Sequence, residues 1–162
     1  MQQILVVDDE IGIRELLAEI LGDEGHSVHL AEGAQAARRL RDDAAFDLVL
    51  LDIWMPDVDG ITLLKEWGAT GLLNMPVVMM SGHGTIDTAV EATKFGAMAF
   101  LEKPITLQKL LRAVEDALSD FRVPVVLDHF AGVRVSDAAD FAAQAQAVLR
   151  LLGTGRVYVK LS

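Results

Sequence analysis

The chain has 162 residues, of which 52% are hydrophobic, and its formal net charge is -10 at pH 7. This length fits one domain, or one domain with an added fragment, and the negative charge argues against direct binding to nucleic acid. Because the sequence contains no cysteine, disulfides and thiolate metal sites are excluded, and a cytoplasmic location is expected. We find no apolar run of membrane-spanning length and no signal segment at Met1, so no membrane association is expected.

Short apolar runs alternate with segments of helical periodicity along the first 121 residues. Strands are predicted at 4–7, 27–30, 48–51, 76–80 and 97–101. Helices are predicted at 11–22, 34–41, 61–67, 86–95 and 107–118. This alternation is typical of an α/β fold whose parallel sheet is covered by helices on both faces. On the second helix, Arg38, Arg39 and Arg41 are expected to face solvent.

Acidic residues directly follow two of the predicted strands. Asp52 comes after the run 48–51, and Asp8 and Asp9 come after the run 4–7. Because the carboxyl ends of parallel strands meet at one edge of a sheet, the three aspartates are expected to share a pocket. A cation would relieve the repulsion between their charges, and Mg²⁺ prefers oxygen ligands such as carboxylates. A carboxylate beside such an ion can accept a phosphoryl group. The alternative reading is that Asp52 merely begins a turn.

Two further polar residues follow the fourth and fifth predicted strands. Ser81 comes after Met80 in a glycine-containing loop, and Lys103 comes two residues after Leu101. Pro104 restricts the backbone of Lys103 and is a candidate for a cis peptide bond. Each residue taken alone would be read as a turn residue or a solvated side chain. Together with the acids they predict a phosphate site, in which Mg²⁺ and Lys103 neutralise a phosphate on Asp52 and Ser81 donates to it.

The set Asp8-Asp9, Asp52, Ser81 and Lys103-Pro104, in this order at strand ends, resembles the receiver domain of two-component response regulators. The resemblance covers residues 1–121. The amino-acid sequences at 52–57, 80–85 and 100–104 resemble those of NtrC-group receivers, and those of NtrX-type regulators most closely. The resemblance implies a flavodoxin-like, doubly wound, five-stranded parallel domain that acts in signalling and is not an enzyme.

The same resemblance implies roles for individual residues. Asp52 would be phosphorylated by a sensor histidine kinase in a Mg²⁺-dependent reaction. Asp9, Asp52 and the backbone carbonyl of Trp54 would bind the ion directly, and Asp8 would bind it through water. Lys103 would pair with the phosphate. We also hypothesise that Trp54 and His83, which flank the route of an attacking water, tune dephosphorylation.

Phosphorylation is expected to act as a switch through Ser81 and Phe100. Ser81 would move toward the phosphate, and Phe100 stands where the family has its switch aromatic, although it lacks the usual tyrosine hydroxyl. The alternative reading of Phe100 is an ordinary core residue. The surface of the fourth and fifth helices would change and would form a homodimer or bind an output domain.

Residues 122–162 depart from the resemblance. Strands at 123–130 and 155–162 and a helix at 136–152 predict a βαβ extension. Its strands resemble a fragment of a (βα)8-barrel (TIM-barrel) amidohydrolase, in which Asp128 and His129 would lie at the catalytic edge. Because a metallohydrolase needs ligands from other strands, a structural role is preferred for both residues.

Three readings of the joined chain remain. It could be an engineered or recombined chimera of receiver and barrel without a physiological output, which we favour. It could instead carry an appended element through which two copies dimerise. A metal-dependent hydrolase fragment is the third reading.

Overall fold

The computed structural model describes residues 1–82, 86–122, 125–128 and 157–160. The chain separates into two compact units, Met1–Phe121 and Arg122–Ser162. We describe each unit by itself.

The first unit contains a five-stranded sheet in which every pair of neighbouring strands is parallel. The strands are β1 (Gln3–Val7), β2 (Ser27–Ala31), β3 (Leu48–Asp52), β4 (Val77–Ser81) and β5 (Ala99–Glu102). Their order across the sheet is β2-β1-β3-β4-β5. The predicted α/β class and the five parallel strands are therefore confirmed.

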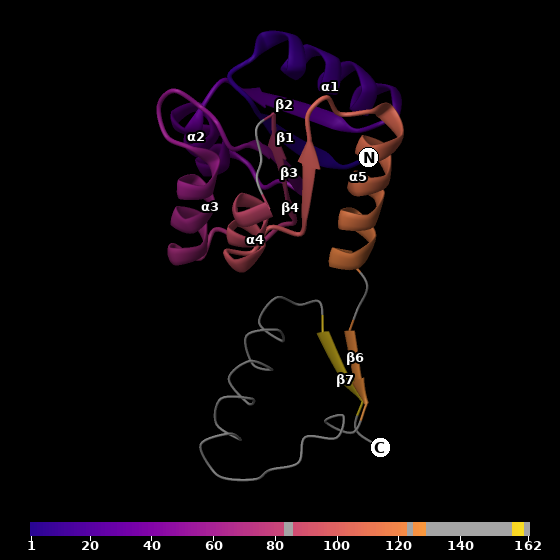
Figure 1. The fold of residues 1–162 in the computed structure, drawn as a ribbon. Helices are drawn as coiled ribbons and strands as arrows, with labels where there is room; N and C mark the ends of the chain where they lie inside the picture. Colours follow the sequence, from indigo (N-terminus) through magenta and orange to yellow (C-terminus); the bar gives the residue numbers. More distant parts are fainter. Residues whose placement is uncertain (83–85, 123–124, 129–156, 161–162) are drawn as a thin grey trace. The chain divides into compact units, whose positions relative to one another are not determined.

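Helices cover both faces of this sheet (Figure 1). They are α1 (Ile11–Asp23), α2 (Ala34–Asp43), α3 (Gly60–Ala69), α4 (Ile86–Lys94) and α5 (Leu107–Arg122). One hydrophobic cluster joins the sheet to α2, α3 and α4, and a second joins it to α1 and α5. Since both faces are covered, strands β3 and β4 are buried along their whole length, which explains their continuous apolar sequences.

The register of the strands aligns the residues at their carboxyl ends. Asp52 is the last residue of β3 and pairs with Met80, and Ser81 is the last residue of β4 and pairs with Glu102. The amide of Lys103 donates to the carbonyl of Ser81 at 2.7 Å. The sheet therefore brings the polar ends of β3, β4 and β5 to one edge.

The expectation that all three arginines of α2 face solvent is wrong for Arg41. Its side chain is buried, donates to the backbone carbonyl of Leu72 and to Asn74 Oδ1, and lies 5.6 Å from the centre of a Trp67 ring. A long arginine side chain can cover an aromatic ring while its guanidinium still finds acceptors. Arg41 thus ties α2 to the connection between α3 and β4.

The second unit contains a parallel pair of strands, β6 (Val125–Asp128) and β7 (Val157–Lys160). The predicted helix at 136–152 and His129 lie outside the described residues. The βαβ extension therefore stays a prediction. Over the parts of the chain that are described, no helix has both the length and the apolar character needed to span a membrane.

Gly60, the first residue of α3, lies against the end of β3. A methyl group at this position would overlap the backbone carbonyl of Asp52. We expect Gly60→Ala to lower the free energy of unfolding by about 1–3 kcal/mol, because the strand or the helix must shift. Urea denaturation measures this change.

Gly12→Ala is the matched control, because a methyl group at Gly12 on α1 meets no atom within 4 Å. Alanine is favoured over glycine within a helix, so we expect this variant to be neutral or stabilised by about 0.5–1 kcal/mol. Equal stabilities of the two variants would show that Gly60 is not required by packing.

Candidate functional site

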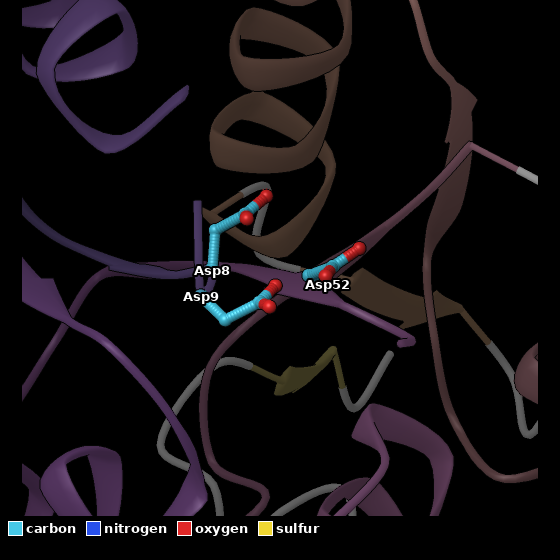
Figure 2. Close-up of side chains that lie close together, drawn as sticks. All are labelled: Asp8, Asp9 and Asp52. Atoms are coloured by element: carbon cyan, nitrogen blue, oxygen red, sulfur yellow. The ribbon is translucent and has the colours of Figure 1, made fainter. Parts of the chain in front are cut away.

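Three aspartates gather at the carboxyl edge of the sheet. Figure 2 shows the side chains of Asp8, Asp9 and Asp52 close together, and one carboxylate oxygen from each lies within 4.8 Å of the others. Asp8 is completely buried and Asp52 is 2% exposed, whereas Asp9 is exposed. The three aspartates thus lie close together in the structure, as predicted.

Lys103 contacts the carboxylates of this acidic cluster. Its Nζ atom lies 2.8 Å from Asp8 Oδ2, 3.3 Å from Asp52 Oδ1 and 3.6 Å from Glu10 Oε1. Burial acts to lower the pKa of Lys103, but the hydrogen bond to Asp8 and the charge of Asp52 outweigh it, so the pKa is raised. The peptide bond between Lys103 and Pro104 is cis.

Asp52 is a carboxylic acid with a strongly perturbed pKa. Burial is the largest cause and the charge of Asp8 is the next, and together they raise the pKa from 3.8 to about 6 although Lys103 opposes them. A nearby cation would lower this pKa again, because it stabilises the ionised form of the acid. The pocket therefore favours binding of a positively charged ligand.

The loop from β1 to α1 holds two of the acids through contacts that sequence reasoning missed. Asp8 Oδ1 accepts the amide of Glu10 at 2.9 Å, and the guanidinium of Arg14 donates to the carbonyls of Asp8 and Asp9. The available signal was the position of Arg14 in the first turn of α1, because helical side chains point back toward the amino end. Glu10 was also missed as a neighbour of Lys103, although it adjoins the two aspartates.

The loop from β3 to α3 is fixed by a second pair of unpredicted contacts. Asp57 Oδ2 accepts the amide of Gln35 at the start of α2 at 3.1 Å, and Asp59 caps α3 by accepting the amide of Thr62 at 2.8 Å. Slight burial acts to raise the pKa of Asp57, but backbone hydrogen bonds outweigh it and the pKa is lowered. In this loop Trp54 is 57% exposed.

The remaining predicted residues differ in where they lie. Ser81 is fully buried at the end of β4. Phe100 on β5 is half-buried and packs against the core, and His83 is outside the described residues. The structure thus brings Ser81 to the edge that carries the acids, and the position of Phe100 fits both readings given to it.

Residues 4–115 match the family described as the response regulator receiver domain. The chain belongs to this family. The nitrogen assimilation regulatory protein NtrX of Azorhizobium caulinodans is 44% identical over 124 residues, which are 74% of this chain and 27% of that protein. The chain spans about a quarter of the length of the curated relatives it matches.

Two solved structures of receivers are similar. The receiver domain of NtrX from Brucella abortus is 47% identical with a TM-score of 0.67, covering 72% of this chain and 98% of that one. The beryllofluoride-activated NtrC4 receiver domain dimer is 36% identical with a TM-score of 0.70, covering 75% and 99%. The predicted resemblance to receivers with NtrC-type and NtrX-type relatives is confirmed, and the chain is a signalling domain.

Receiver domains bind Mg²⁺ in an acidic pocket, and phosphorylation of an aspartate by a kinase is typical of the family. The acids of this receiver suit that ion, because the cluster offers three carboxylates and Mg²⁺ prefers oxygen ligands. The buried charge of Asp8 and Asp52 gives the same indication, since a dication would offset their repulsion more fully than Lys103 alone.

The raised pKa of Asp52 has a consequence for stability in metal-free protein. Between pH 3.8 and about 6 the folded chain holds a proton that the unfolded chain releases, so stability falls as the pH rises through this window. Asp52→Asn removes this loss. At roughly 1.4 kcal/mol per pKa unit, we expect the variant to be more stable than the parent by about 3 kcal/mol at pH 7.

Thermal unfolding in EDTA from pH 4 to pH 7 measures the difference, which should shrink toward pH 4. Asp43→Asn, at an exposed position on α2, is the control for removal of one negative charge. If Asp43→Asn reproduced the whole gain, net charge rather than burial of Asp52 would explain it.

Proposed function

We propose that this receiver accepts a phosphoryl group on Asp52 from a sensor histidine kinase in a Mg²⁺-dependent reaction. The observation that carries the proposal is the placement of Asp52 at the end of β3, beside Asp8 and Asp9 and 3.3 Å from Lys103 Nζ. A carboxylate in this position would share a cation with its acidic neighbours while Lys103 stabilises its charge.

The residues at this edge divide the work of the transfer. Asp9, Asp52 and the backbone carbonyl of Trp54 would hold Mg²⁺, and Asp8 would hold it through water. The bound ion would neutralise charge on the phosphoryl oxygens. An oxygen of Asp52 forms the new bond to phosphorus while the bond from phosphorus to the donor's histidine nitrogen breaks, and that nitrogen keeps the electron pair. Lys103 then pairs with the phosphate.

The phosphate would move Ser81 and, with it, α4. Phosphorylation adds about -1.5 to -2 charge at pH 7, which a serine hydroxyl and Lys103 can bind. The weak attachment of α4 supports this proposal, because Ala92 is the one buried residue of this fully described helix, and Val90 is 61% exposed. Phe100 on the neighbouring strand β5 would change its packing at the same time.

We expect the full chain to gain one phosphoryl group when it is incubated with Mg²⁺ and acetyl phosphate, a small phosphoryl donor. Asp52→Asn and addition of EDTA should each abolish the gain, which intact-mass spectrometry measures. Asp59→Asn is the matched control, because asparagine also caps helices and Asp59 has no role in the proposed transfer. Phosphorylation of the Asp52→Asn protein to the parental level would contradict the proposal.

We further propose that activation produces a homodimer through α4 and α5. The relative NtrC4 supports this, since its beryllofluoride-activated receiver domain is a dimer. In the present chain Ile86, Val90 and Met98 are exposed apolar residues of α4 and the turn before β5, at 84%, 61% and 39%. Exposed apolar side chains on neighbouring elements are typical of protein contact surfaces.

We expect beryllofluoride with Mg²⁺ to double the mass measured by light scattering on a sizing column. Val90→Asp should keep the activated chain monomeric, because it introduces a charge into the apolar contact. Leu16→Asp on α1 is the control, as Leu16 is 48% exposed but lies on a different helix. A dimer that persists in Val90→Asp would point instead to contacts through the second unit.

We propose two domains, a receiver at residues 1–121 and a separate extension at residues 122–162. The division into two compact units supports this organisation. The barrel-fragment and chimera readings of the extension stay predictions, as does the metal-dependent hydrolase reading. The expected cytoplasmic location and the expected absence of direct contact with nucleic acid also stay predictions.

A further inference from the structure

Arg14 reaches back from the first turn of α1 to the loop that carries the acids. Its Nη1 atom donates to the carbonyl of Asp8 at 2.8 Å and to the carbonyl of Asp9 at 3.0 Å. Its own amide donates to the carbonyl of Glu10 at 3.1 Å. One side chain therefore fixes two successive peptide groups next to the proposed magnesium site.

The carboxylate of Asp9 depends on this backbone more than its neighbours do. Asp8 is held by its side chain, which accepts from Lys103 Nζ and from the amide of Glu10. The Asp9 carboxylate, in contrast, is exposed and accepts no hydrogen bond from the part of the chain that the structure describes. The helix start does not stabilise the loop by capping either, since the side chain of the cap residue Glu10 makes no capping hydrogen bond.

We propose that Arg14 is a positioning residue that holds the loop from β1 to α1 so that Asp9 and Asp52 can share one Mg²⁺. The inference rests on the proposed function. Arginine suits this task because its guanidinium stays charged and presents several donors in a fixed plane, and charge-assisted hydrogen bonds are stronger than neutral ones.

Loss of the charge of Arg14 and loss of its contacts to the loop should change the affinity for Mg²⁺ in opposite directions. A guanidinium near a dication site repels the ion, so removal of its charge alone would tighten Mg²⁺ binding. If Arg14 acts by holding the loop, its removal weakens Mg²⁺ binding, since the ligands must then be ordered when the ion binds. The direction of the change in affinity therefore separates the two effects.

The experiment titrates the full chain with Mg²⁺ and follows tryptophan fluorescence. Trp54 is exposed and lies two residues after Asp52, so its emission reports on the site. We expect Arg14→Gln to raise the dissociation constant for Mg²⁺ about tenfold, the lower end of the effect of groups that orient metal ligands. Arg14→Lys, which keeps the charge but has fewer donors and no fixed plane, should lie between this variant and the parent.

Arg39→Gln is the matched control, because it removes the same charge from an exposed position on α2. We expect its dissociation constant to equal the parental value or to fall slightly. In an Asp9→Asn background, Arg14→Gln should add little further loss, because the ligand that Arg14 positions is already absent.

A second readout uses metal-free protein. Hydrogen exchange at the amide of Glu10 should be faster in Arg14→Gln than in the parent, because the loop opens more often. If Arg14→Gln bound Mg²⁺ as tightly as the parent, or more tightly, the positioning role of Arg14 would be overturned and the proposed function would stand. If Arg14→Gln failed to fold, Arg14→Lys and Asp9→Asn would replace it. The positioning role would then be overturned if Arg14→Lys kept the parental affinity for Mg²⁺ and the parental exchange rate, and Asp9→Asn lost no affinity for Mg²⁺. A parent that shows no saturable response to Mg²⁺ would overturn the proposed magnesium site as well.

Discussion

Negative charge buried at the end of a parallel sheet is the constraint on which this receiver depends. Asp8 and Asp52 are both almost inaccessible to solvent, and burial, followed by the charge of Asp8, raises the pKa of Asp52 to about 6. Lys103 offsets part of the repulsion by contacting both carboxylates. The remaining imbalance leaves the pocket with a deficit of positive charge. A bound cation would supply the missing positive charge, and a phosphate on Asp52 would add negative charge again. Both proposed events therefore change the electrostatic energy of the same pocket.

The surroundings of the pocket differ in how firmly they are held. The strands that carry Asp52 and Ser81 are buried along their whole length and belong to clusters on both faces of the sheet. Helix α4, by contrast, buries Ala92 and is joined to α3 by Lys65, which pairs with Glu91 at 2.9 Å. Exposed ion pairs contribute little stability. The buried strands thus hold Asp52 and Ser81 firmly, while α4 contributes little to the core.

The sequence was sufficient to predict the sheet and the group of residues at its edge. Continuous apolar runs, turn residues and the shared edge of parallel strands together placed Asp8, Asp52 and Lys103 in one pocket. Contacts to backbone acceptors far along the chain were beyond this reasoning. Arg41 was assigned to solvent because a pattern of charges on a short helix does not reveal the carbonyl of Leu72, which lies 31 residues away in the chain. Arg14 was missed although its partners lie only five and six residues away, since they are backbone carbonyls and not side chains.

The surface of α4 also bears on how such a domain can diverge. Ile86 and Val90 lie on a helix that contributes little to the core, so replacing them alters the face offered to other molecules at small cost in folding free energy. The acids and Lys103 lie on separate elements and need not change with them. After gene duplication, one copy of this chain could therefore acquire a different binding partner through a few surface mutations while it keeps the acidic pocket and Lys103 unchanged.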